Sequence, residues 1–271
     1  MKIAFIGGGN MAAALIGGLI KRGVAPADLY AIDPNEEARA RNAQQFGVGT
    51  GAAADAALAS FDAILLAVKP QILKSVAASL APFLRAEQLV ISIAAGIRAD
   101  DLSHWLNGHA RVVRTMPNTP ALIGMGATGL FATPGVDEAG RALATQVLGA
   151  VSHTVWFDDE AKIDAVTAIS GSGPAYVFYF IEALEEAARQ LGMDAAQGRA
   201  LAVATFTGAA QLAAQSSESP AVLRERVTSK GGTTAAALAS FDASGVKDAI
   251  VRGALAADAR AKAMGDEFGK Q

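Results

Sequence analysis

The chain of 271 residues contains no cysteine and only three histidines. Without cysteine it cannot form a disulfide, use a thiolate in catalysis or offer a cysteine ligand to zinc. The histidines, His104, His109 and His153, are scattered along the chain, so we expect no metal site. Charge is also sparse: the formal net charge is −3, and no run of lysine or arginine is longer than a pair. Nucleic acid is therefore not an expected partner.

Long apolar runs are absent as well, although 52% of the residues are hydrophobic. No stretch reaches the roughly 18 uninterrupted apolar residues of a membrane span. At the N-terminus, the run Ile3–Ile6 leads directly into glycines, which makes it too short for the core of a signal peptide. We therefore expect no membrane partner and a cytoplasmic location.

Residues 1–158 are predicted to form an α/β domain of the Rossmann type. Short β-branched runs alternate there with alanine-rich helical stretches, as a parallel sheet covered by helices requires. The expected strands are Lys2–Ile6, Leu29–Ile32, Ala63–Ala67, Leu89–Ser92, Arg111–Thr115, Thr128–Phe131 and His153–Trp156. Beyond Asp158 the strand signals stop, which sets the predicted domain boundary.

Residues 159–271 are predicted to form an all-α domain. Apolar residues recur at spacings of three and four from Val177 to Leu191, which is typical of one helix face. The next expected helix, 195–215, is apolar on most of its circumference, which indicates burial on several sides. One copy of so small a helical domain does not easily supply that burial, so we predict an obligate homodimer that shares these helices.

The first strand runs into a glycine-rich turn and then a helix, in the order Ile6-Gly7-Gly8-Gly9-Asn10-Met11-Ala12. In such a fingerprint Gly7 permits the tight turn, Gly9 lets the backbone approach a pyrophosphate, and Ala12 allows close helix packing. The diphosphate then lies at a helix N-terminus, where free amides favour an anion. This context predicts dinucleotide binding.

Asp33 ends the second strand, about 20 residues beyond the fingerprint, where a carboxylate binds the adenosine ribose. Taken alone it favours NAD, because a carboxylate repels a 2′-phosphate. The alternative is a plain turn residue in Asp33-Pro34-Asn35.

Three further strands end in peptides that contain proline or glycine. These peptides are Ala67-Val68-Lys69-Pro70, Ser92-Ile93-Ala94-Ala95-Gly96 and Met116-Pro117-Asn118-Thr119-Pro120. Each peptide alone is compatible with an ordinary loop that ends a strand. Because open α/β sheets bind ligands beyond the carboxyl ends of their strands, we expect these peptides to line one crevice with the glycine turn.

Two clusters in the helical half precede helices. The first, Ser170-Gly171-Ser172-Gly173-Pro174-Ala175-Tyr176, is compatible with helix capping by Ser172 and with function alike. The second, Ser229-Lys230-Gly231-Gly232-Thr233-Thr234, exposes backbone amides at a helix start, which suits a substrate carboxylate. Its threonine hydroxyls can give or accept a hydrogen bond. Capping is the alternative here, and the pattern favours substrate binding.

Taken in order along nearly the whole chain, these six motifs resemble the Δ1-pyrroline-5-carboxylate reductase family. The resemblance implies a Rossmann domain, a helical dimerisation domain and, in some members, rings of dimers. It also implies reduction of a cyclic imine carboxylate to L-proline by hydride from NADPH or NADH, the last step of proline biosynthesis.

The resemblance implies which residues of this chain bind the cofactor and the substrate, motif by motif. With Asp33 added from the fingerprint, the expected cofactor-binding residues are Gly7, Gly8, Gly9, Asn10, Met11, Asp33, Ala67, Val68, Lys69, Pro70, Ala94, Ala95, Gly96 and Asn118. Of these, Ala94, Ala95, Gly96 and Asn118 are expected near the nicotinamide. The expected substrate-binding residues are Ser229, Gly231, Gly232, Thr233 and Thr234.

The chain departs from the family pattern at two places. Lys230 stands where proline is common, so the loop is expected to be more mobile, and the lysine can add charge near the carboxylate. Family members often prefer NADPH, yet no arginine directly adjoins Asp33; Arg39 and Arg41 lie farther along the next helix. The choice between NADP and NAD therefore stays open.

The predicted mechanism needs no strong enzyme acid, because a cyclic imine can arrive protonated. We assign Thr234 the catalytic role of a hydrogen bond to the ring nitrogen, while backbone groups of Gly231–Thr233 hold the carboxylate. Orientation over the nicotinamide would then supply most of the rate enhancement.

Two other interpretations compete with this one. A β-hydroxyacid dehydrogenase shares the domain order but uses a lysine on a long helix, and Tyr176–Glu182 contains none. A non-catalytic NAD(P) sensor would not need the carboxylate-binding loop at Ser229–Thr234.

Overall fold

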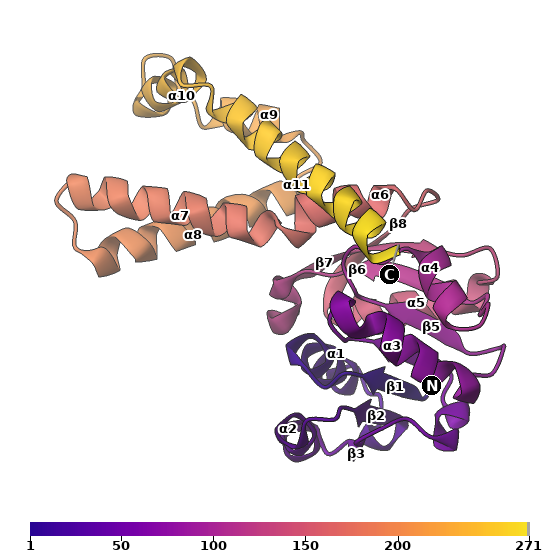
Figure 1. Cartoon of the computed structure of the whole chain (residues 1–271). Helices are drawn as coiled ribbons and strands as arrows, with labels where there is room; N and C mark the ends of the chain where they lie inside the picture. The colour runs from indigo at the N-terminus through magenta and orange to yellow at the C-terminus, as the bar shows by residue number, and fades with distance from the viewer. Residues whose placement is uncertain (270–271) are drawn as a thin grey trace. The chain divides into compact units, whose positions relative to one another are not determined.

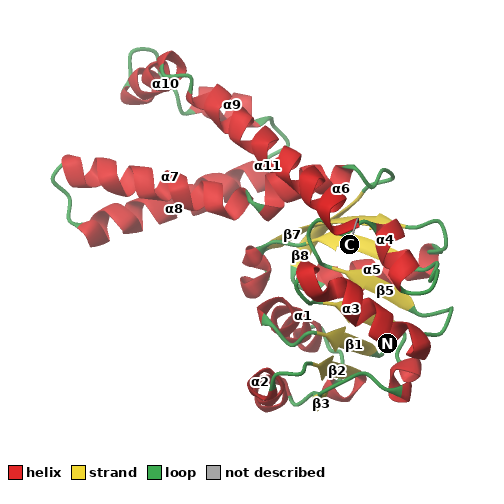
Figure 2. Cartoon of the chain, in the orientation of Figure 1, coloured by secondary structure: helices red, strands yellow, loops and turns green. Residues whose placement is uncertain are grey.

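The computed structural model describes residues 1–269, which divide into two compact units (Figure 1). The first unit contains Met1–Ser172 and the chain from Ala257 onward, and the second contains Gly173–Ala256. Strands are confined to the first unit within the described residues, as the yellow arrows of Figure 2 show.

The first unit is built on one eight-stranded sheet with the strand order β3-β2-β1-β4-β5-β6-β7-β8. Neighbouring strands from β3 to β6 are parallel, β7 is antiparallel to β6, and β8 is parallel to β7. The strands are β1 (Ile3–Ile6), β2 (Leu29–Ile32), β3 (Gly49–Gly51), β4 (Ala63–Leu66), β5 (Leu89–Ser92), β6 (Val112–Met116), β7 (Gly126–Ala132) and β8 (Ser152–Trp156).

Both faces of the sheet are covered by helices. Side chains of β1 alternate between two apolar clusters, with Ile3 and Phe5 in one and Ala4 and Ile6 in the other. The first cluster contains residues of α1 (Asn10–Lys21) and α5 (Glu138–Gly149), and the second contains residues of α3 (Pro70–Leu80) and α4 (Ala99–Trp105). Burial on both faces explains the nearly continuous apolar runs of the central strands.

The predicted fold class is confirmed, and all seven expected strands are present within two residues of their expected bounds. The eighth, β3, was missed because two of its three residues are glycines, which carry no strand signal. The expectation of a parallel sheet is wrong for β7, which is antiparallel to β6. Only Pro117–Met125 connect β6 to β7, which is too short for the crossover that a parallel pair needs.

The second unit contains α7 (Gly173–Gln190), α8 (Ala195–Gln215), α9 (Pro220–Arg226), α10 (Thr233–Ala243) and the first turns of α11 (Val246–Gly269). Helices α7 and α8 pack together, with the rings of Phe180 and Phe206 6.4 Å apart. Asp194 and Gln197 form a capping box that begins α8. The two helices predicted over this region are therefore observed.

Ser172 is not the N-cap of α7, which corrects the sequence prediction. Its backbone is helical, and its N–H donates to the carbonyl oxygen of Thr167 at 2.8 Å, within a π-helical turn over Thr167–Gly171. An N-cap needs a non-helical backbone, so the helix continues through this position from the preceding turn.

Helix α6 (Lys162–Val166) belongs by its contacts to the first unit. Ile163 and Asp164 are buried there, and a Cβ atom on Gly129 of β7 would lie 2.6 Å from Val166. The last turns of α11 also return to the first unit. The domain boundary expected near residue 158 marks the change from strands to helices. The boundary between the two compact units lies farther on, after Ser172.

The helical unit exposes many large apolar side chains in the single chain. They are Val177, Phe178, Tyr179, Leu184, Leu191, Met193, Leu201, Val203, Leu212, Val222, Val227, Phe241, Ile250, Val251 and Leu255. So much exposed apolar surface on one small unit is characteristic of a protein interface.

Among residues 1–269, no helix combines the length and apolar character needed to cross a membrane.

Candidate active site

The glycine turn after β1 has the form expected of a dinucleotide site. Gly7 has φ +100°, and a Cβ atom there would lie 2.6 Å from the carbonyl oxygen of Ala67, so only glycine fits. Gly9 precedes α1, no side chain caps that helix, and a Cβ at Gly9 would meet nothing within 4 Å. Ala12 is fully buried. The turn thus leaves open space and uncapped amides where a diphosphate would bind.

Asp33 fastens this turn. One carboxylate oxygen accepts the N–H of Gly8 at 2.7 Å, and the other accepts the N–H of Asn35 at 2.8 Å. The turn role that the sequence left open is therefore present. Each oxygen keeps a second lone pair, so the same carboxylate can also accept from a ribose hydroxyl.

Two residues that sequence analysis did not assign to the site also hold Gly8. The side chains of Arg41 and Asn42, both on α2 (Glu36–Phe46), donate to the carbonyl oxygen of Gly8 at 2.8 and 2.9 Å. Asn42 is fully buried, whereas Arg41 is exposed. Arg39 instead donates to the carbonyl oxygens of Asp33 and Pro34. Nothing in a polar, largely exposed helix marks Asn42 as buried, so no sequence signal pointed to it.

The other expected loops follow β4, β5 and β6. Ala67 donates its N–H to Ile6 at 2.8 Å, and Pro70 begins α3. The hydroxyl of Thr115 on β6 donates to the carbonyl of Ser92 at 2.9 Å, just before Ala94–Gly96. Since β1, β4, β5 and β6 are parallel neighbours, their carboxyl ends bring Gly7–Met11, Ala67–Pro70, Ala94–Gly96 and Asn118 to one edge of the sheet.

Asn118 uses both ends of its side-chain amide within the protein. Its Nδ2 donates to the carbonyl of Ser170 at 3.0 Å, and its Oδ1 accepts the N–H of Ala127 at 2.8 Å. The residue therefore joins the start of β7 to the π-helical turn. In this role it holds the surrounding backbone.

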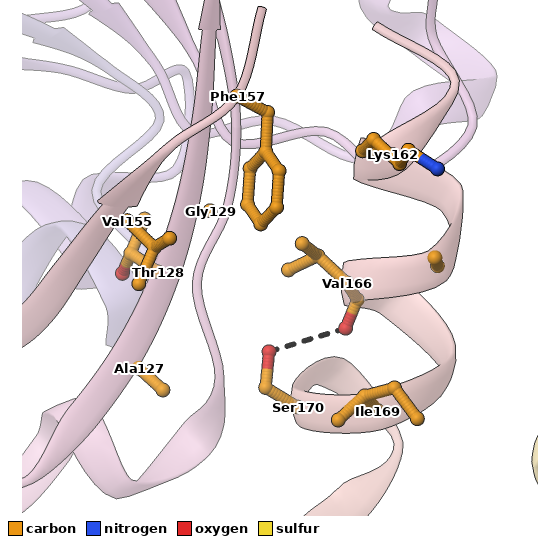
Figure 3. Close-up of a pocket in the computed structure, with 10 residues that line it drawn as sticks. Ala127, Thr128, Gly129, Val155, Phe157, Lys162, Val166, Ile169 and Ser170 are labelled. Carbon is orange, nitrogen blue, oxygen red and sulfur yellow. Dashed lines mark hydrogen bonds between the residues drawn. The ribbon is translucent and has the colours of Figure 1, made fainter. Parts of the chain in front are cut away.

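Beside this junction lies a cavity of about 320 Å³ between β7, β8 and α6 (Figure 3). Strand side chains form one wall, Val166, Ile169 and Ser170 form the other, and the hydroxyl of Ser170 donates to the carbonyl of Val166. The lining residues are Ala127, Thr128, Gly129, Val155, Phe157, Lys162, Ala165, Val166, Ile169 and Ser170. Because they are almost all apolar, this cavity does not supply the groups that orient a charged substrate.

The expected substrate loop lies in the other unit. Gly231 has φ +74°, the N–H of Gly232 donates to the carbonyl of Ser229 at 3.0 Å, and α10 begins at Thr233 with no side-chain cap. A Cβ atom at Gly232 would lie 2.4 Å from the hydroxyl oxygen of Ser229, so a larger residue there would displace the Ser229 side chain. Thr234 is half-buried and Lys230 is exposed. The loop therefore offers uncapped helix amides to an anion.

Nearly the whole chain is similar to known proteins. Residues 160–264 match the family model for pyrroline-5-carboxylate reductase dimerisation, and residues 2–96 match that for NADP oxidoreductase, coenzyme F420-dependent. The pyrroline-5-carboxylate reductase of Pseudomonas aeruginosa is 47% identical over 99% of this chain and 98% of its own. The Pisum sativum enzyme is 33% identical over 97% and 95%.

This chain belongs to the pyrroline-5-carboxylate reductase family. The solved structure of a pyrroline-5-carboxylate reductase from Coxiella burnetii has a TM-score of 0.91 and 37% identity, covering 97% of this chain and 98% of its own. The Plasmodium falciparum pyrroline carboxylate reductase, solved with NADP bound, has a TM-score of 0.85 and 29% identity over 98% of both chains.

Proposed function

We propose that this chain reduces Δ1-pyrroline-5-carboxylate to L-proline with NADPH or NADH, as the last step of proline biosynthesis. The single observation that carries this proposal is the full-length similarity to pyrroline-5-carboxylate reductases. Family membership favours imine reduction over the two alternatives, and α7 indeed contains no lysine for a β-hydroxyacid dehydrogenase. The direct test is the loss of NAD(P)H absorbance on addition of pyrroline-5-carboxylate.

The first unit's own residues fit a dinucleotide. The open space at Gly9 and the uncapped start of α1 suit the diphosphate, and the peptides Ala67–Pro70 and Ala94–Gly96 line the same edge of the sheet. A bound reduced nicotinamide supplies the hydride. The residues Gly7–Met11, Asp33, Ala67–Pro70, Ala94–Gly96 and Asn118 would hold it.

In the helical unit the loop Ser229–Thr234 would hold the substrate. Backbone amides of Gly231–Thr233 would bind the carboxylate, because the start of α10 has no cap of its own. Thr234 would hydrogen-bond the ring nitrogen, and the imine can bind already protonated. The enzyme's contribution is then chiefly orientation, which is compatible with a loop that contains no histidine and no carboxylic acid.

Replacing Thr234 with alanine is expected to lower kcat/KM by about tenfold or more, because one hydrogen bond in the transition state is lost. The matched control is Thr228→Ala. The hydroxyl of Thr228, in the same loop region, donates to the carbonyl of Arg224 in the preceding helix, α9. Steady-state kinetics should separate the two variants, and an unchanged kcat/KM in folded Thr234→Ala would remove Thr234 from the mechanism.

Cofactor choice depends on the charges around Gly8. Replacing Asp33 with asparagine removes a negative charge beside the expected ribose, and the exposed Arg41 stays. We expect the dissociation constant of NADH divided by that of NADPH to rise about fivefold. The reason is that the lost repulsion between the carboxylate and the 2′-phosphate is worth about 1 kcal/mol. Asp55→Asn is the control, because Asp55 is an exposed carboxylate that caps a turn elsewhere. An unmoved ratio would mean that Asp33 acts only on the turn.

Two copies would associate through the helical unit, and a ring of such dimers is the larger assembly to look for. Sedimentation measures both. We also propose a cytoplasmic location, which fractionation of cells tests.

A further inference from the structure

The C-terminal turns of α11 lie directly on the loop that follows β5. A Cβ atom on Gly96, which has φ +74°, would lie 3.0 Å from Met264 and 3.4 Å from the ring of Phe268. Phe268 also packs against the apolar cluster on this face of the sheet. These two side chains therefore cover the middle of the loop, at a position whose positive φ favours glycine.

Polar contacts continue the same interface toward α4. Arg98 forms an ion pair with Asp266, and the hydrogen bond that the guanidinium donates to this carboxylate raises the pKa of Arg98. A Cβ atom on the buried Gly265 would lie 3.3 Å from the guanidinium of Arg98. One turn on, a Cβ atom on Gly269 would lie 2.8 Å from Asp101. Successive residues of the end of α11 thus contact successive residues from Gly96 to Asp101.

The two ends of the same loop are held by other elements. Thr115 binds the carbonyl of Ser92 at the entry, as described above. At the exit, the N–H of Ala99 donates to Glu160 at 2.7 Å, and Glu160 is paired with the buried Arg114. Arg114 is itself bound to Asp164 at 2.6 Å. With both ends fixed, the position of the peptide around Gly96 depends on what covers it.

We propose that Met264–Gly269, the end of α11, is a positioning element for the nicotinamide loop Ala94–Gly96. This inference rests on the proposed function, which places the nicotinamide at that loop. The contacts of this helix end converge on one loop of the expected cofactor site. The residues Arg98–Asp101 and Gly265–Gly269 lie outside both segments that match family models.

A displaced loop would misalign the hydride donor more than it would weaken cofactor binding. The diphosphate site at Gly7–Met11 is on a different loop and would be unchanged. Misplacement by about 1 Å can cost up to about 100-fold in rate. The effect should therefore appear in kcat and in the hydride-transfer step, with little change in the dissociation constant of the cofactor.

The test is the double variant Met264→Ala with Phe268→Ala. In the free protein, hydrogen exchange of the amides of residues 93–98 should accelerate by about tenfold, because their cover is removed. In the assay, kcat should fall by about tenfold, and the primary isotope effect with deuterated NADPH should increase as hydride transfer becomes slower. The dissociation constant of NADPH, from fluorescence titration, should stay within about twofold. Met264→Leu with Phe268→Leu should restore both exchange and kcat.

A milder pair of variants uses adjacent residues on the same helix. Asp266→Asn breaks the ion pair with Arg98, whereas Glu267→Gln breaks the ion pair with Arg260, which lies within α11. Asp266→Asn should accelerate exchange at residues 93–98, and Glu267→Gln should not. Equal exchange in both, or an isotope effect that stays at the wild-type value in the double variant, would overturn the proposal. The exchange measurement needs no substrate, so its failure is distinct from an inactive wild-type enzyme.

Discussion

Replacing Gly9 with valine should raise the KM for the reduced cofactor by about 100-fold, because the new side chain fills the space assigned to the diphosphate. The fold itself should tolerate the change. Gly9 has an extended backbone with φ −72° and ψ −172°, and apart from its chain neighbours no atom of residues 1–269 lies within 4 Å of its Cβ position. Steady-state kinetics and thermal unfolding of the purified protein measure the two effects separately.

The control for this variant is Gly149→Val. For Gly149, at the end of α5, likewise no atom of residues 1–269 lies within 4 Å of its Cβ position, apart from its chain neighbours and its own helix backbone. The Gly149→Val substitution should leave both KM and the unfolding temperature close to those of the wild type. If Gly9→Val binds NADPH and NADH as tightly as the wild type, the glycine turn is not the cofactor site.

Charges placed on the outer face of α8 should separate the dimer. Leu201 and Leu212 are 57% and 69% exposed in the single chain and lie three helical turns apart on one face. With glutamate at both positions, the interface would bury unpaired charges, and we expect the dimer dissociation constant to rise by about 1000-fold. Sedimentation should then show a monomer at concentrations where the wild type is a dimer.

A matched control introduces the same two charges on the same helix. Gln211 and Gln215 are exposed and polar, so Gln211→Glu with Gln215→Glu should leave the dimer intact. A wild-type chain that is a stable monomer at micromolar concentration would contradict the predicted dimer. Equal dissociation by the two double variants would mean that added charge alone, rather than this apolar face, separates the subunits.

Local patterns in the sequence were enough to predict the elements that carry the cofactor site. The turn Gly7–Gly9 was predicted because a strand before it and a helix after it constrain the chain within ten residues. Helix α7 was predicted from apolar spacing, which depends only on the helical period. Strand β3 and the direction of β7 were missed, since a glycine-rich edge strand has little local signal and strand direction depends on pairing.

By itself the sequence determined the Rossmann fingerprint, the order of the motifs and the resemblance to one reductase family. Only the tertiary structure decided that Asp33 fastens Gly8, that Asn42 is buried under the same turn, and that α11 covers Gly96. Gly96 and Phe268 are far apart along the chain and meet only after folding. Periodicity and turn propensity act over a few residues, whereas such contacts depend on how distant elements pack.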